Sequence, residues 1–149
     1  MRKKKETMIY EGLGFPIRLV NVPMKKVCGE WAFDINFNHL HTVVLNMLAR
    51  KPTPLTGKEI GFIIDCFEIS IRDFAKLFGV THAAVLKWEK EEAKMNPATE
   101  VYLRLYILDH LKTTNKEFRK VYSKITPYNL AHSVYENTPL EIDVLKIAC

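Results

Sequence analysis

Five side chains that lie close together in the sequence have the types needed to contact the bases and phosphates of DNA. His82 can donate to a guanine N7 or O6 or to a phosphate, and Lys87 can reach guanine or phosphate. The small Ala83 and Ala84 can meet a thymine methyl group, and Thr81 can bind a phosphate at a helix N-terminus. Taken singly, His82 and Lys87 are also typical of solvated surface residues, so their meaning depends on the element that carries them.

Residues 70–90 predict two short helices joined by a tight turn, which would present these five side chains together. Ser70 and Thr81 are good N-caps, because a hydroxyl can accept a hydrogen bond from an orphan backbone N–H. Gly79 is expected to end the first helix, since glycine adopts the left-handed conformation without steric cost. Apolar residues at helical spacing predict the inner faces: Phe74, Leu77, Phe78, Val85 and Trp88. Any corner between two helices needs similar residues, so the pattern also suits a purely structural corner.

The run Phe74–Thr81, followed by Val85 and Trp88, resembles the helix-turn-helix of the Xre (lambda-repressor/Cro-type) family. Leu55–Ile60 resembles the start of that family's first helix. The resemblance implies a sequence-specific DNA-binding regulator of transcription whose second helix, residues 82–90, enters the major groove. It also implies repression, and a homodimer on a two-fold site in double-stranded DNA.

Contacts to the DNA backbone are expected from basic residues around the predicted recognition helix. The family usually has Gln where this chain has Ile71, so we expect these contacts from Arg72, Lys76 and Lys90. Residues 55–90 hold five Lys or Arg and five Asp or Glu, so the segment is not basic overall. This balance leaves an alternative open, a protein-binding module that uses the helix-turn-helix only as a scaffold.

Residues 10–30 resemble the N-terminal region of MqsA/YgiT-like antitoxins, which have a β-rich zinc module before an Xre helix-turn-helix. This resemblance implies antitoxin-like autoregulation, with a toxin or other protein partner bound through residues 1–50. That family's module holds zinc with paired C-x-x-C motifs, whereas only Cys28-Gly29-Glu30 matches one corner here. His39 and His41 point to different faces of a helix. We therefore expect no metal site and no cofactor.

The chain as a whole is predicted to be mostly α, with an Xre-type domain of four to five helices after a small β-containing segment and a helix. The N-terminal module covers residues 1–50 and combines a β-hairpin or meander with a helix at 36–50. Residues 51–54 predict a linker, because each proline biases its predecessor away from helix. The DNA-binding domain then covers 55–125, and 126–149 form a C-terminal extension.

Two segments allow more than one interpretation. The helix that Asn96-Pro97 opens is apolar over most of its circumference. Its outer residues Tyr102, Leu105 and Tyr106 therefore suit a dimer interface or burial within one subunit. In the extension, residues 138–141 form a capping-box pattern, whereas 140–144 alternate as a strand would; the sequence does not decide between them.

The totals exclude several classes of protein. The formal charge of +5 suits a polyanion partner, and no apolar run reaches the ~18 residues that span a bilayer. The basic start lacks an apolar h-region, so no secretion signal is expected. Three widely spaced cysteines favour a reducing cytoplasm. No nucleophile, P-loop, dinucleotide or paired-carboxylate pattern is present, so we expect no enzymatic activity.

Overall fold

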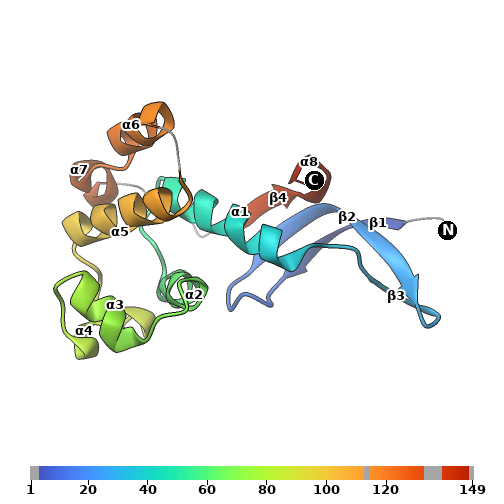
Figure 1. Ribbon diagram of the computed structural model, residues 1–149, viewed down its shortest axis with the longest axis horizontal. Coiled ribbons are helices and arrows are strands. Elements are labelled where there is room, and N and C mark those ends of the chain that lie inside the picture. The colour runs from blue at the N-terminus through green and yellow to red at the C-terminus, as the bar shows by residue number, and fades with distance from the viewer. Residues whose placement is uncertain (1–3, 113–114, 133–138, 148–149) are drawn as a thin grey trace. The chain divides into compact units, whose positions relative to one another are not determined.

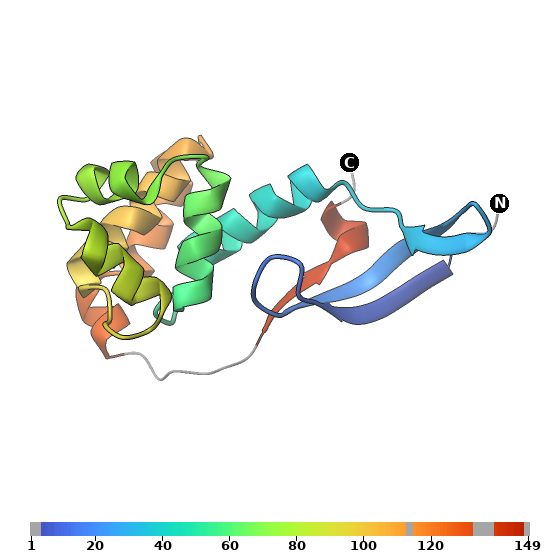
Figure 2. The same cartoon turned by 90° about the horizontal axis from the view of Figure 1, so that it is seen from below.

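The computed structural model describes residues 4–112, 115–132 and 139–147. The chain folds as two compact units, Met1–Val43 with Asn137–Cys149, and Val44–Glu136. Figures 1 and 2 show a sheet in the first unit and packed helices in the second. The division differs from the predicted limits at 50, 54 and 125, because it falls within one helix and groups the C-terminal residues with the N-terminal strands.

A long central strand organises the first unit. It pairs antiparallel with two strands and parallel with a fourth, which arrives from the other end of the chain. A short helix follows the parallel strand and packs against the central one. The elements are β1 (Lys4–Tyr10), β2 (Ile17–Val27), β3 (Glu30–Phe33), β4 (Leu140–Asp143) and α8 (Val144–Ile147).

A bulge in β2 changes which side chains face the core. Ile17 and Leu19 are buried at odd positions, whereas Val22 and Met24 are buried at even positions. Between these pairs the register with β1 shifts, and Asn21 adopts a φ of +56°. The extra residue of a bulge moves the alternation by one, so apolar residues on both sides of it reach the same core.

β2 also continues through Pro23, although proline has no backbone N–H to donate. The carbonyl of Pro23 accepts from the backbone N–H of Asp34 at 2.8 Å, on the side of β2 that carries β3 and β4. β4 pairs with β2 up to Val20, and β3 pairs from Met24 onward. The carbonyl and the nitrogen of one strand residue point to the same side, so the nitrogen of Pro23 points away from β1. Pro23 therefore removes no hydrogen bond from the β1–β2 ladder.

The prediction of a mostly α fold is wrong. The four-stranded mixed sheet makes the chain an α+β protein. The predicted extension is not an appendage, because β4 completes the sheet beside β2 and Asn21 Nδ2 donates to Asp143 Oδ2 at 3.2 Å. Parallel pairing with a strand more than a hundred residues away leaves no local signal, so the sequence could not reveal it.

The helices begin where the sequence provides caps. Thr56 and Glu59 form a complete capping box, and Asn96 caps the helix that starts at Pro97, where the sequence predicted a helix to begin. α1 crosses the division between the units, and the next six described helices belong to the second unit. The bounds are α1 (Phe37–Arg50), α2 (Gly57–Cys66), α3 (Ile71–Leu77), α4 (His82–Glu89), α5 (Pro97–His110), α6 (Asn115–Lys124) and α7 (Pro127–Ala131). None of the described helices is long and apolar enough to cross a membrane.

A buried arginine fixes the segment predicted as a linker. Arg104 is completely buried in α5; it donates to the backbone carbonyls of Lys51 and Thr53 and pairs with Glu100 at 2.8 Å. The other carboxylate oxygen of Glu100 accepts from the backbone N–H of Leu55 at 3.1 Å. Residues 51–55 therefore belong to the packed second unit. Burial lowers the pKa of Arg104, and the charge of Glu100 opposes this effect.

Candidate functional site

Hydrogen bonds define where α3 starts and where it ends, and its end forms the turn into α4. The hydroxyl of Ser70 accepts from the backbone N–H of Asp73 at 3.0 Å, which caps the helix start. At the other end Gly79 has a φ of +66°, and the N–H of Val80 donates to the carbonyl of Ala75 at 2.9 Å. This αL residue with its six-to-one bond is a Schellman motif, which ends the helix abruptly. The two helices are thus joined by a short, well-determined turn.

α4 has one buried face and one exposed end. Val85 is fully buried and Trp88 is 7% exposed, so this face packs inward against α2 and α3. Thr81 Oγ1 accepts from the N–H of Ala84 at 3.1 Å and caps the helix. The side chains at its N-terminal end are in solvent, except that Ala84 is half-buried. The exposed ones are Thr81, His82, Ala83 and, one turn on, Lys87.

The C-terminal end of α4 lies unusually close to the start of α2. A Cβ added to Gly57 would lie 2.4 Å from the carbonyl oxygen of Glu89 and 2.5 Å from that of Trp88. The N–H of Gly57 donates to Glu91 Oε1 at 3.0 Å. Glu91 itself has a φ of +59°, and the N–H of Glu92 closes a second Schellman motif onto Lys87. Gly57 and Glu91 therefore position α4, a role the sequence did not suggest; the one hint was a glycine directly after the Thr56 cap.

The predicted phosphate contacts come from three exposed side chains on two elements. Arg72 and Lys76 lie on α3, and Lys90 is the C-cap of α4. Ile71, at the position where the family usually has Gln, is half-buried. Asp73 and Glu68 are exposed nearby, so the surface around α3 mixes both signs of charge.

The predicted dimer residues on α5 divide into two kinds. The ring of Tyr106 contacts those of Phe67 and Phe78, with centroid separations of 5.3 and 5.7 Å, and Leu105 is half-buried. The ring of Tyr102 also contacts Phe78, at 5.0 Å, yet Tyr102 is 52% exposed. Tyr106 is thus packed within its own subunit, and Tyr102 is the residue of the three that offers most surface to a partner.

Two titratable groups on the inner side of this unit have shifted pKa values. Burial, with a smaller effect from Asp65, raises the pKa of the Cys66 thiol to about 11. The thiol therefore stays protonated at neutral pH and is a poor nucleophile. Burial, again with Asp65, also raises the pKa of Glu89. Within the described part of the chain, no group of three or more His, Cys, Asp or Glu is placed to hold a metal ion.

Comparison with protein-family models, with curated proteins and with solved structures finds no match to this chain. The resemblances to Xre proteins and to MqsA/YgiT-like antitoxins therefore stay predictions that depend on the residues quoted for them. The geometry of α3 and α4 has to be interpreted by itself.

Proposed function

We propose that this chain is a cytoplasmic DNA-binding protein that inserts α4 into the major groove of double-stranded DNA and represses transcription. The observation that carries the proposal is the asymmetry of α4. Val85 and Trp88 are buried, whereas His82, Ala83 and Lys87 are exposed at its N-terminal end. The major groove admits one α-helix, and recognition helices of this type contact bases through their N-terminal residues.

Each exposed residue has a role that its chemistry supports. His82 and Lys87 would donate to guanine or to phosphate, and the small Ala83, with the half-buried Ala84, would allow close approach to thymine methyl groups. Thr81 would bind a phosphate at the start of α4. The flanking cations that would contact the DNA backbone are Arg72, Lys76 and Lys90.

Salt-dependent binding to duplex DNA tests this proposal. Each phosphate contact contributes about −0.9 to the slope of log K against log salt, so several contacts give a steep slope. Lys87→Glu should weaken binding and make the slope shallower by about one. Lys124→Glu is the matched control, because Lys124 is an exposed lysine on α6, outside α3 and α4; it should leave affinity and slope nearly unchanged.

A second candidate is a protein-binding module in which α3 and α4 are only scaffold. The mixed charges at Asp73, Glu68, Arg72 and Lys76 favour it, since tight phosphate binding needs excess positive charge on one face. Absence of duplex affinity at low salt would refute DNA binding and leave this candidate. Equal effects of Lys87→Glu and Lys124→Glu would mean that only overall charge matters and that α4 does not enter the groove.

A further inference from the structure

A pocket of about 640 Å³ lies within the second unit, beside the C-terminal end of α4. Its walls come from the segment before α2, from α2 and α4, from the loop that joins α4 to α5, and from α5 and α7. Its size falls in the range of about 300–1,000 Å³ that is typical of small-molecule sites. The DNA-contacting residues proposed above are not among its lining residues.

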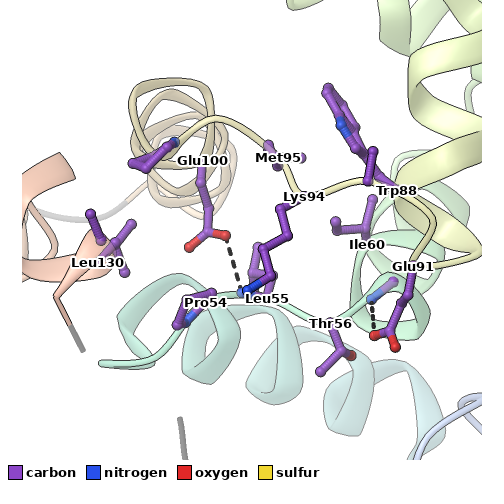
Figure 3. A pocket seen from close by; sticks show the side chains of 14 residues that line it. Pro54, Leu55, Thr56, Ile60, Trp88, Glu91, Lys94, Met95, Glu100 and Leu130 are labelled. Atoms are coloured by element: carbon purple, nitrogen blue, oxygen red, sulfur yellow. Dashed lines mark hydrogen bonds between the residues drawn. The ribbon is translucent and has the colours of Figure 1, made fainter. Parts of the chain in front are cut away.

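The walls are mainly apolar and already packed. Leu55, Ile60, Trp88 and Leu130 each line the pocket and are at most 9% exposed. Figure 3 shows Leu130 on one side of the pocket and Ile60 and Trp88 on the other. These side chains are held by the core on their far sides, so the hollow between them is largely preformed. Trp88 adds an aromatic ring to this wall, and aromatic rings pair favourably with other rings.

The buried part of the pocket offers no partner to a charged ligand. Glu100 is the buried carboxylate of the wall, and both of its oxygens are engaged, one by the N–H of Leu55 and one by Arg104. Figure 3 shows the first of these bonds. The lining residues Lys94 and Glu91 carry opposite charges and are exposed to solvent. A charge placed among the buried lining residues would lose its hydration without gaining a partner, whereas a neutral ring would not.

We infer that this pocket is a binding site for a small, neutral, ring-containing molecule. Such a ligand would contact Trp88 of α4 and also Leu130 of α7, and would thereby join the two helices. The inference does not depend on DNA binding, because the site and its test involve other residues.

Titration with indole, followed by NMR of methyl-labelled methionines, tests the inference. Met95 lines the pocket, whereas Met8, Met24 and Met47 do not, so the same spectrum contains its own controls. Indole should shift the Met95 methyl signal saturably and leave the other three in place. The cationic tryptamine and the anionic indole-3-acetate should bind more weakly.

Two substitutions separate occupancy of the pocket from general effects on the fold. Ala131→Phe adds a ring to an exposed lining residue and should fill the hollow, so the Met95 shift with indole should be lost. Ala98→Phe makes the same change at an exposed position of α5 outside the lining, and the shift should persist. No saturable Met95 shift up to the solubility limit of indole would overturn the inference. Stronger binding of either charged analogue, or an undiminished shift in Ala131→Phe, would overturn it as well.

Discussion

The close approach of α2 to α4 predicts that two glycines of the same helix respond to alanine in opposite ways. In Gly57→Ala, the new Cβ would lie 2.4 Å from the carbonyl oxygen of Glu89, whereas ordinary van der Waals contact begins at 3.4 Å. Both opposing atoms are backbone, so no rotamer change can relieve the clash, and the helices must separate by about 1 Å. Such overpacking lowers the free energy of unfolding by about 1–3 kcal/mol.

Gly61→Ala provides the matched control one turn along α2. There the Cβ would meet only the carboxylate of Glu89, at 3.7 Å, which is ordinary contact. Alanine is favoured over glycine inside a helix by about 0.5–1 kcal/mol, so this variant should gain stability. The two variants therefore differ in sign, although each adds the same methyl group to the same helix.

Urea denaturation followed by Trp88 fluorescence measures both effects. Trp31 belongs to the other unit and is 42% exposed, so Trp31→Phe can serve as the common background and leave a single reporter in the helical unit. The free energies should be compared at unchanged m values, because a change in m signals loss of two-state behaviour. If Gly57→Ala proved as stable as the parent, or if both variants gained equally, the described packing of α2 on α4 would be refuted.

Three further predictions follow from the same unit. Glu68 has a φ of +54° just after α2, a left-handed conformation that glycine adopts more easily. Glu68→Gly should therefore raise the free energy of unfolding by about 0.5–1 kcal/mol in urea denaturation. No gain would mean that the residue is not left-handed. Arg104→Met removes the charged partner of the buried Glu100 carboxylate. It should lower the free energy of unfolding by about 3–5 kcal/mol by the same measurement. A loss below ~1 kcal/mol would show that the pair is solvated. The pKa of Glu89 is raised in the folded state by burial and by Asp65, so its contribution to stability is present in acid and lost as pH rises through the folded pKa. Glu89→Gln should consequently stabilise the protein at neutral pH and not in acid, and an equal gain at both pH values would contradict the assigned cause.

The local part of this fold could be predicted from the sequence. Caps such as Thr56, Ser70 and Asn96 act within three residues, so their helices begin where the residue types indicate. The apolar spacing likewise predicted that Val85 and Trp88 would be buried, but it was wrong for Leu77, which is 39% exposed. These features depend on neighbours in the chain, which are visible without coordinates.

The rest depends on contacts between distant residues. The sequence does not show on which side of β2 the nitrogen of Pro23 points, because that side is set by the pairing of β2 with β1 and by Asp34. The prolines at 52 and 54 looked like a linker, because the sequence does not reveal that Arg104 binds the carbonyl of the residue before each of them. Glycine is required at position 57 only because the backbone at the C-terminal end of α4 lies against it. The sequence thus indicated the candidate side chains on α4, but it did not indicate Gly57 and Glu91, which position that helix.

The parallel pairing of β2 with β4 has a consequence for the order of synthesis. Asn21 and Asp143, which meet at the end of this pair, are 122 positions apart in the chain. During synthesis on the ribosome, residues 17–20 of β2 therefore lack their β4 partner while the whole helical unit emerges and folds. We expect a nascent chain stalled before residue 140 to contain protease-resistant helices next to a protease-sensitive N-terminal segment.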